Sequence, residues 1–281
     1  SVLQVFDSSL NSYDSSSIIS RINKNAPGVR TDSMFRVVFR EASRVYQITG
    51  GAFDITLAPL INAWGFGSGE QMDLDTAMVD SLLQYVGMDK VILAGDRVIK
   101  SDPHVELNVN AIAQGYSVDI LAAYLEGLGC RNYMVEVGGE IRTRGVNSMG
   151  NFWRIGVDRP DLGNNVPGSQ LQVIINMHDR SLATSGNYRK FYEKDGIMIS
   201  HTIDPATGFP KASNLLSVSI LCDDCITADA YATACMVMGL EKAQAFVENL
   251  KGVDAYFIYG DRYGNYQVWN TDGLSKYIES P

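Results

Sequence analysis

The chain has 281 residues, of which 46% are hydrophobic and 20% are charged, and this is the composition of an ordinary folded protein. Its net charge of −9 argues against binding to a nucleic-acid backbone, which needs clustered Lys and Arg side chains. No apolar run approaches the ~20 residues that a helix spanning a bilayer needs. An acidic protein that binds a phosphate compound needs a metal ion or helix N-termini to offset the charge.

The first part of the chain predicts helices separated by turns. A short helix is expected to end near Asn25, and a longer one covers residues 32–51, where a Gly-Gly pair stops it. Its apolar stripe consists of Phe35, Val38, Phe39, Ala42 and Val45. Residues 52–69 mix glycine with aromatic and apolar side chains and predict a loop with a short helix. Residues 76–87 predict another amphipathic helix.

Two short strands, residues 90–95 and 97–101, are expected to pair as a hairpin around Asp96. The clearest helical pattern of the chain follows at residues 115–129, with Gly129 as its C-terminal cap. The apolar stripe of this helix consists of Val118, Leu121, Ala122 and Leu125.

The second half of the chain predicts strands first and helices afterwards. Strands are expected at residues 133–145, 152–158, 171–177, 180–186, 196–204 and 215–222. Helices are expected at residues 227–239 and 240–250, before a closing hairpin at 254–269. Because helices and strands come in clumps, we expect an α+β fold with antiparallel or mixed sheets packed with helices. No repeat or linker divides the sequence, so residues 1–281 are predicted to form a single domain.

The four cysteines, which include Cys130 and Cys235, are too few for a disulfide scaffold. Cys222 and Cys225 form a Cys-x-x-Cys pair, which is typical of redox-active sites or of half a zinc site. No second pair and no neighbouring His completes a metal site. We therefore expect incidental thiols, or at most one local disulfide.

The stretch "TADAYATA" (residues 227–234) carries a possible cation site. A helix capped by Thr227 would place Asp229 in its first turn and Thr233 four residues later on the same face. A carboxylate and a hydroxyl so placed could share one hard cation, and the helix N-terminus would favour an anion such as a phosphate. An ordinary structural role, in which Asp229 complements the helix dipole and Thr233 bonds back to the preceding turn, explains the same spacing.

Three other stretches leave similar alternatives open. Residues 108–119 lead through small side chains into a helix, and either admit a large flat ligand or place Asn110 as a helix cap. Gly138 and Gly139 form either a hairpin turn or a close approach of backbone to ligand. The aromatic side chains of residues 50–67 either stack on a planar ring or fill the core.

The chain has three histidines, and one of them precedes an Asp-Pro-x-Thr-Gly turn in "SHTIDPATGFP" (residues 200–210). An unperturbed imidazole titrates near neutral pH, so His201 is a candidate general acid or base. The turn would hold it rigidly. A hairpin histidine bonded to the backbone fits equally well. His104 and His178 lack such a context and are expected at the surface.

Taken in order, seven segments resemble the ApbE-like family of FAD:protein FMN transferases. They span residues 10 to 239, and together they are far more specific than any one alone. The segments are "LNSYDSSSIISRIN", "GGAFDITLAPLINAWGFG", "LNVNAIAQGYSVD", "VEVGGEIRTRG", "LATSGNYRKF", "SHTIDPATGFP" and "TADAYATACMVMG".

The resemblance implies an enzyme that depends on Mg²⁺ and moves the FMN half of FAD onto a Thr hydroxyl of an acceptor protein, with release of AMP. It implies metal ligands at Asp229, Thr233 and the backbone oxygen of Ala111, and a proton acceptor at His201. The FAD contacts that it implies are Tyr13, Ala52, Phe53, Asp54, Asn108, Gln114 and Ile203. The acceptor would be a subunit of a redox-driven membrane pump or of an electron-transfer complex.

The sequence departs from the family at three places. Asn108 stands where an acidic residue is usual, and Gln114 stands where Lys or Glu is common. The Met-Gly-Thr strand that the family has before its first helix is missing. Family members are typically exported, often as lipoproteins, so we expect an exported protein that is either periplasmic or anchored in the membrane as a lipoprotein. Its link to the membrane would be a lipid anchor that has been removed from this chain.

Two other functions stay open beside the transferase. Water in place of the acceptor Thr would make the protein a Mg²⁺-dependent FAD pyrophosphatase that yields FMN and AMP. The neutral side chains of Asn108 and Gln114 fit a third function, a protein that binds FAD without turnover.

Overall fold

Helices and antiparallel strands follow one another in clumps, so the α+β prediction is confirmed. The computed structural model describes residues 1–67, 72–161, 168–187, 191–194 and 197–279. The chain forms two compact units, of which unit 1 contains residues 1–113 and 201–211 and unit 2 the remainder. The boundary falls inside helix α6 (Asn110–Gly127). The single domain over residues 1–281 stays a prediction.

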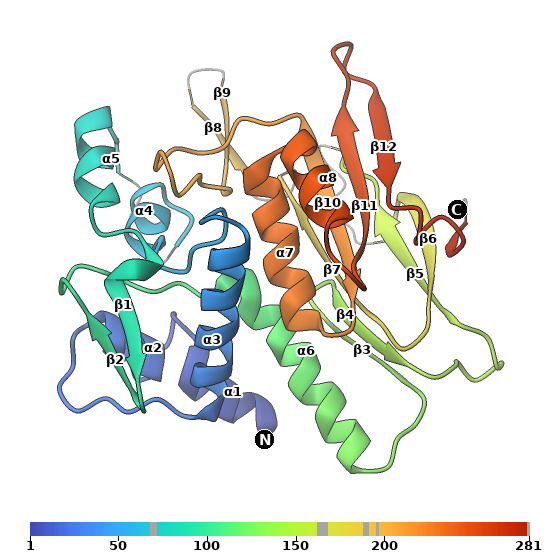
Figure 1. Cartoon of the computed structure of the whole chain (residues 1–281), viewed down its shortest axis with the longest axis horizontal. Helices are drawn as coiled ribbons and strands as arrows, with labels where there is room; N and C mark the ends of the chain where they lie inside the picture. Colours follow the sequence, from blue (N-terminus) through green and yellow to red (C-terminus); the bar gives the residue numbers. More distant parts are fainter. Residues whose placement is uncertain (68–71, 162–167, 188–190, 195–196, 280–281) are drawn as a thin grey trace. The chain divides into compact units, whose positions relative to one another are not determined.

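Unit 1 is mainly helical, and a β-hairpin completes it (Figure 1). All five side chains of the predicted apolar stripe on α3 are buried. Strands β1 and β2 pair antiparallel around the expected turn at Asp96. The elements are α1 (Val2–Leu10), α2 (Ile18–Asn23), α3 (Ser33–Ile48), α4 (Ala58–Ala63), α5 (Thr76–Leu83), the 3₁₀ turn η1 (Met88–Lys90), β1 (Val91–Ala94) and β2 (Arg97–Lys100).

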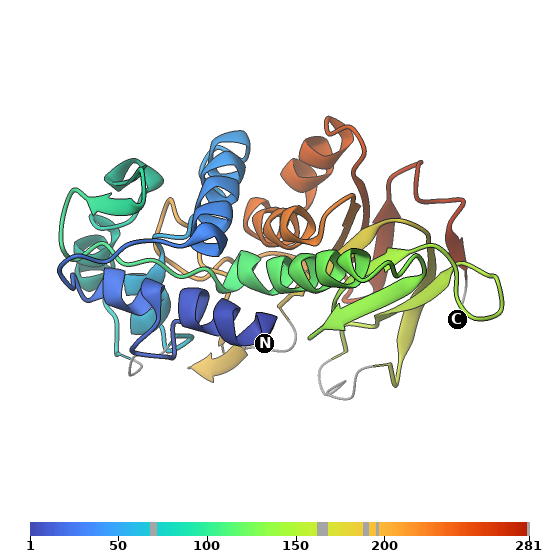
Figure 2. The ribbon, with the colours of Figure 1, turned by 90° about the horizontal axis from the view of Figure 1, so that it is seen from below.

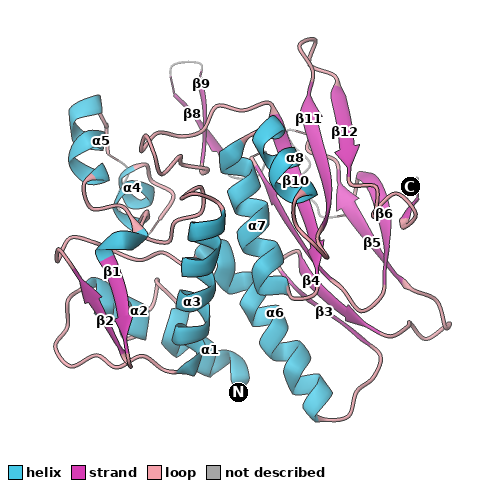
Figure 3. Ribbon diagram, in the orientation of Figure 1, coloured by secondary structure: helices cyan, strands magenta, loops and turns pink. Residues whose placement is uncertain are grey.

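Unit 2 has helices on one face of a six-stranded sheet and a smaller sheet on the other face (Figures 2 and 3). The helices are α6, α7 (Cys225–Met238) and α8 (Leu240–Glu248). The strands are β3 (Tyr133–Val137), β4 (Glu140–Arg144), β5 (Trp153–Asp158), β6 (Leu171–Met177), β7 (Ser181–Gly186), β8 (Phe191–Lys194), β9 (Ile197–Ser200), β10 (Leu215–Cys222), β11 (Asp254–Gly260), β12 (Tyr266–Asn270) and β13 (Ile278–Glu279).

The large sheet has the order β12-β11-β10-β7-β4-β3, and its described strands pair antiparallel. Strand β10 is central and almost wholly buried, because α7 covers one face and the β5–β6 side covers the other. Its residue Ser219 pairs with Tyr256 on β11 and with Thr184 on β7. This register places β7 directly beneath α7.

Helix α6 ends as predicted. Gly129 has a φ of +82°, and its amide donates to the Glu126 carbonyl at 2.9 Å. The Cys130 amide donates to the Leu125 carbonyl at 3.1 Å. These two bonds form the Schellman motif, in which glycine accepts the left-handed conformation that other residues resist. In the described ranges no helix is long and apolar enough to cross a membrane.

Helix α2 ends at Asn23 with Lys24 as its cap, near the predicted end, but the start of α7 was predicted wrongly. Helix α7 begins at Cys225 with Asp224 as its cap, because the Asp224 carboxylate accepts the Thr227 amide at 3.0 Å. Asp229 therefore lies in the second turn of α7 and not in the first. The sequence had also not indicated α1.

Candidate functional site

Asp229 lies where helices α6 and α7 touch. Its side chain is only 5% exposed, and its Oδ2 accepts a hydrogen bond from the Gly115 amide at 2.9 Å. The helices touch because residue 115 has no side chain: a Cβ there would lie 2.3 Å from the Cys225 carbonyl oxygen. Burial raises the pKa of the Asp229 carboxyl to about 7, and the Gly115 amide opposes this shift.

Thr233 follows Asp229 by one turn on the same face of α7. Its hydroxyl lies 3.3 Å from the Ser185 hydroxyl on β7, and its side chain is partly exposed. The Thr233 hydroxyl thus lies next to the Ser185 hydroxyl and on the same face of α7 as the buried Asp229 carboxylate. Since Asp229 lies in the second turn of α7, the positive end of the helix dipole acts on it less strongly than the sequence had suggested.

The backbone oxygen of Ala111 is predicted as a third ligand. Ala111 lies in the first turn of α6, in unit 1, and its role as a ligand stays a prediction. A carbonyl has two lone pairs and can take a cation besides a hydrogen bond.

The donor set fits Mg²⁺. The Asp229 carboxylate and the Thr233 hydroxyl are hard oxygen donors on one face of α7, and Mg²⁺ commonly completes its octahedron with waters and substrate phosphates. The described residues hold no cluster of three or more His, Cys, Asp or Glu side chains that would make a metal cage by themselves. The residues present therefore suit a cation that a phosphate compound helps to hold.

Gln114 directly precedes Gly115 on α6. Its Nε2 donates to the Val137 carbonyl at 2.9 Å, and it occupies the space where a Cβ on residue 138 would stand. Residues 138 and 139 form the turn between β3 and β4. The close approach at Gly138 is thus to the Gln114 side chain.

In unit 1, Asn108 joins two predicted segments. Its amide donates to the Ile55 carbonyl at 2.7 Å, which ties it to the loop that follows Asp54. Its side-chain oxygen accepts the Asn110 amide at 2.9 Å. Asn108 therefore makes the turn into α6, whereas Asn110 is the first residue of the helix and not its cap.

Asp54 is 8% exposed and is engaged inside its own loop. Its Oδ1 accepts from the amide of Thr56 at 2.7 Å and from the hydroxyl of Thr56 at 2.6 Å. The same hydroxyl accepts the Gly87 amide at 2.6 Å. Burial raises the pKa of the Asp54 carboxyl, and the two bonds from Thr56 oppose this shift.

The other predicted flavin contacts in unit 1 differ in exposure. Phe53 is 2% exposed and belongs to the core, so a ligand would reach it through the backbone. Ala52 is partly exposed, and Tyr13 is 64% exposed. In the aromatic stretch Trp64 is buried and fills the core, which is the ordinary structural role.

The Asp-Pro-x-Thr-Gly turn is closed by its own backbone. The Asp204 carbonyl accepts the Gly208 amide at 2.8 Å, and the Asp204 amide donates to the Phe209 carbonyl at 2.9 Å. Lys211 pairs with the Asp204 carboxylate at 3.0 Å, and its amide donates to the Thr202 carbonyl at 2.8 Å. These bonds confirm the rigid turn that the sequence predicts.

The turn is also anchored to α4 and α5. The Trp64 indole donates to the Gly208 carbonyl at 2.9 Å. Gly208 has a φ of +74°, and a Cβ there would lie 2.6 Å from Val79. Only glycine therefore fits at this position. Ile203, which bridges to Pro210, is 3% exposed.

His201 begins this segment and is partly exposed. Its ring lies edge-on to Phe66, with ring centroids 6.2 Å apart. The imidazole is thus packed on one side and accessible in part, and its role as a general base stays a prediction. His104 and His178 are exposed, as predicted.

The cysteines form no disulfide. Burial raises the pKa of Cys222 to about 12 and raises that of Cys225 well above its ordinary value. Both side chains lie in the core, where the Cys225 thiol points to the Ile141 carbonyl at 3.6 Å. Thiols so buried are poor nucleophiles, which fits the prediction of incidental cysteines.

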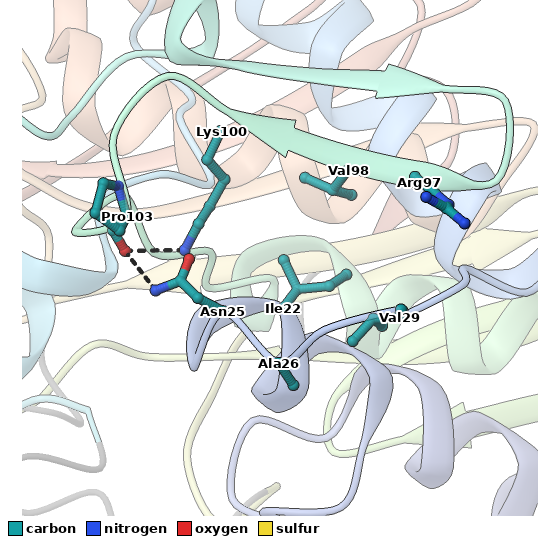
Figure 4. A pocket seen from close by; sticks show the side chains of 9 residues that line it. Ile22, Asn25, Ala26, Val29, Arg97, Val98, Lys100 and Pro103 are labelled. Atoms are coloured by element: carbon teal, nitrogen blue, oxygen red, sulfur yellow. Dashed lines mark hydrogen bonds between the residues drawn. The ribbon is translucent and has the colours of Figure 1, made fainter.

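A pocket of about 340 Å³ lies elsewhere in unit 1, and none of its lining residues is a predicted site residue. Figure 4 shows Lys100 and Asn25 both directed at the Pro103 carbonyl, at 3.1 and 3.0 Å. Burial lowers the pKa of the Lys100 ammonium. The cation at this end of the pocket is thus engaged by the protein's own backbone.

Three residues with a part in the geometry had no predicted role. Gly115 lies inside a quoted segment, yet only its contact with α7 explains it. Ser185 lies opposite Thr233, and Asp119 binds the first amides of α7. A helix end and a glycine can be recognised in the sequence, but the sequence does not show which residue each of them contacts in the fold. Two predicted segments lie partly outside the described residues. These are residues 188–190 of the segment "LATSGNYRKF" (residues 182–191) and residue 196 of the strand expected at 196–204.

Comparisons with known proteins identify the family of the chain. The model of the ApbE family matches residues 1–257. A FAD:protein FMN transferase from Vibrio cholerae is 37% identical over 253 residues, covering 88% of this chain and 74% of the relative. The Escherichia coli protein of the same name is 31% identical and covers 99% of this chain and 80% of the relative.

Solved structures give the same result. The flavin transferase ApbE from Vibrio cholerae matches with a TM-score of 0.87 at 32% identity, over 98% of this chain and 87% of that one. The apo form of the Pseudomonas stutzeri flavinyl transferase ApbE matches with a TM-score of 0.85 at 31% identity, over 98% and 85%. The chain belongs to the ApbE family.

Proposed function

We propose that this protein is a FAD:protein FMN transferase that uses Mg²⁺ and moves FMN from FAD to a threonine hydroxyl of an acceptor protein, with release of AMP. Membership of the ApbE family, and relatives that are FAD:protein FMN transferases, support flavin transfer. The observation that carries the chemistry is the buried Asp229 carboxylate, which shares one face of α7 with the Thr233 hydroxyl.

The reaction exchanges one phosphorus–oxygen bond for another. The threonine oxygen bonds to the phosphorus on the FMN side of the pyrophosphate, and the bond from this phosphorus to the bridging oxygen breaks. AMP leaves with that oxygen and its electron pair. The threonine proton needs an acceptor, and charge builds up on the phosphate oxygens.

Asp229, Thr233 and the carbonyl of Ala111 would hold the Mg²⁺. When bound, the cation neutralises phosphate charge and polarises the phosphorus–oxygen bond. Asp229 provides the one negative charge of this donor set. The Gly115 amide fixes one of its oxygens at 2.9 Å and leaves the other for the cation.

His201 would take the proton of the incoming threonine. The closed turn at residues 204–209 and the Phe66 ring restrict how the imidazole can move. A base held in place loses less entropy when the acceptor binds. FAD would contact the protein at Tyr13, Ala52, Phe53, Asp54, Asn108, Gln114 and Ile203.

The test is incubation of the protein with FAD, Mg²⁺ and a peptide that carries an acceptor threonine, followed by mass spectrometry. We expect the peptide to gain the mass of FMN less water, together with free AMP. Free FMN with AMP and an unmodified peptide would instead make the protein a FAD pyrophosphatase. Intact bound FAD would make it a flavin-binding protein without turnover.

Two further properties follow from the family resemblance alone. We propose that the acceptor is a subunit of a redox-driven membrane pump or electron-transfer complex. We also propose that the protein works after export, held to the membrane by a lipid anchor. Fractionation of cells that express the full-length gene, with globomycin to block lipoprotein processing, tests the second point.

A further inference from the structure

The N-terminus of α7 is held by two carboxylates, and one of them comes from another helix. Asp224 caps α7 locally through the Thr227 amide. Asp119 on α6 accepts hydrogen bonds from the two amides that precede Thr227. Its Oδ1 accepts from Cys225 at 3.0 Å, and its Oδ2 accepts from Ile226 at 2.9 Å. The first amides of a helix have no partner within the helix, so this bidentate contact fills two of those positions from outside.

This contact belongs to a ladder between α6 and α7. Gly115 and Asp119 are four residues apart on α6, and Cys225 and Asp229 are four apart on α7, so each pair shares a face. One rung is the bond from Gly115 to the Asp229 carboxylate, and the other is the grip of Asp119 on the start of α7. The two rungs fix both the position of α7 along α6 and its rotation about its own axis.

Arg142 on β4 completes the arrangement. Its Nη1 lies 2.5 Å from the Asp119 carboxylate, and both side chains are largely covered. Burial raises the pKa of the Asp119 carboxyl, while the two amides and the Arg142 guanidinium oppose this shift. A charged hydrogen bond in a covered place is strong and directional, so Asp119 is itself held in place.

A small rotation of α7 would move the ligand oxygens. Asp229 and Thr233 lie one and two turns beyond the residue that Asp119 grips. Metal affinity depends on the direction of each ligand oxygen, and residues that orient ligands typically change it about 10–100-fold when they are removed. The Asp224 carboxylate bonds the Thr227 amide of its own helix, so this cap does not set the rotation of α7 against α6.

We propose that Asp119 is a positioning residue that orients the Asp229 carboxylate and the Thr233 hydroxyl, and so sets the affinity of the divalent-cation site. The inference rests on the proposed Mg²⁺-dependent function. It goes beyond that function because it assigns the affinity of the site to a residue that touches neither the cation nor FAD.

The test compares Asp119→Asn with the matched cap variant Asp224→Asn. Each removes one carboxylate charge at the start of α7, but only Asp119 reaches across from α6. The readouts are the Mg²⁺ concentration that half-saturates FAD binding, followed by flavin fluorescence, and the melting temperature of the metal-free protein. We expect Asp119→Asn to raise the half-saturating Mg²⁺ concentration about tenfold, and Asp224→Asn to leave it near the wild-type value.

An unchanged Mg²⁺ requirement in folded Asp119→Asn, or an equal rise in both variants, would overturn the positioning role. If Asp119→Asn does not fold, Arg142→Lys is the second variant. It keeps the Asp119 carboxylate but replaces the guanidinium that holds it, so we expect a smaller rise in the half-saturating Mg²⁺ concentration. No rise in Arg142→Lys would overturn the positioning role. Wild-type protein whose FAD binding and FMN transfer ignore Mg²⁺ would refute the metal-dependent function first, and this inference with it.

Discussion

Two buried aspartates, one in each unit, use their carboxylates in different ways. Asp54 is 8% exposed and Asp229 is 5% exposed, so burial does not separate them. Asp54 accepts two hydrogen bonds from Thr56, and the Thr56 hydroxyl in turn holds the Gly87 amide. Asp229 accepts an amide from a neighbouring helix and shares a face of α7 with Thr233. The first carboxylate builds a loop, and the second is suited to a ligand.

Replacing Asp229 should have the largest effect. Asp229→Ala removes the only charged donor of the proposed Mg²⁺ site, so we expect FMN transfer to fall by at least about 100-fold. The measurement is the rate of peptide flavinylation over a range of Mg²⁺ concentrations. Full activity of Asp229→Ala with Mg²⁺ still required would refute the metal assignment. Asp54→Ala is the comparison: it removes a proposed FAD contact but no proposed metal ligand, so its rate should fall while flavinylation still depends on Mg²⁺.

His201→Ala should lower the rate without weakening FAD binding. Loss of a general base typically costs about 10²–10⁴-fold in rate. Because the imidazole would act on the acceptor threonine, we expect the Kd for FAD, measured by flavin fluorescence, to stay unchanged. An unchanged rate would reduce His201 to a scaffolding role. A parallel loss of rate and affinity would place it in the FAD site instead.

The buried carboxyl of Asp229 should make the stability of the protein depend on pH. Its pKa is about 7 in the folded protein against 3.8 in the unfolded chain, so the folded state binds the proton more tightly. This contribution to stability is complete below pH 4 and is lost as the pH rises through 7, and it amounts to roughly a few kcal/mol.

Denaturant unfolding in EDTA from pH 4 to pH 8 measures this effect. Asp229→Asn carries no charge, so the difference in unfolding free energy between wild type and variant isolates the one carboxyl. We expect the variant to be the more stable protein at pH 8, with the gap closing towards pH 5. A difference that does not vary with pH would mean that Asp229 is not buried as a titrating acid.

How much of this could be predicted from sequence depends on whether a contact is local. The stripe of α3, the Schellman end of α6 and the turn at residues 204–209 all rest on neighbours within a few residues, and all were predicted. The start of α7 was misplaced because Thr227 and Asp224 are both good capping residues, and only the structure shows which one accepts an amide.

The site was predictable in its residues but not in its geometry. That Asp229 and Thr233 share a face follows from their spacing of four. That Gly115 lets α6 touch α7, and that Asp119 grips the helix start, depends on residues more than a hundred positions apart in the chain. No periodicity or propensity encodes such a pairing. For Asn108 the sequence suggested a ligand contact, whereas the turn that its side chain makes is visible only in the structure.

The smallest expected effect comes from one substitution made at two places. Thr56→Val removes a fully buried hydroxyl that bonds both Asp54 and the Gly87 amide at 2.6 Å. Leaving these partners unsatisfied should cost about 1–3 kcal/mol of unfolding free energy. Thr233→Val removes a partly exposed hydroxyl whose neighbour is Ser185 at 3.3 Å, and should cost no more than about 1 kcal/mol.

Mg²⁺ should respond in the opposite order. Thr233→Val loses a proposed ligand, so its half-saturating Mg²⁺ concentration should rise, whereas that of Thr56→Val should stay at the wild-type value. Urea unfolding and Mg²⁺-dependent FAD binding measure the two quantities on the same samples. If Thr233→Val were the less stable variant and bound Mg²⁺ normally, the Thr233 hydroxyl would be part of the scaffold. Asp229 would then have no side-chain partner on α7 in the proposed Mg²⁺ site, and its contrast with Asp54 would rest on the carboxylate alone.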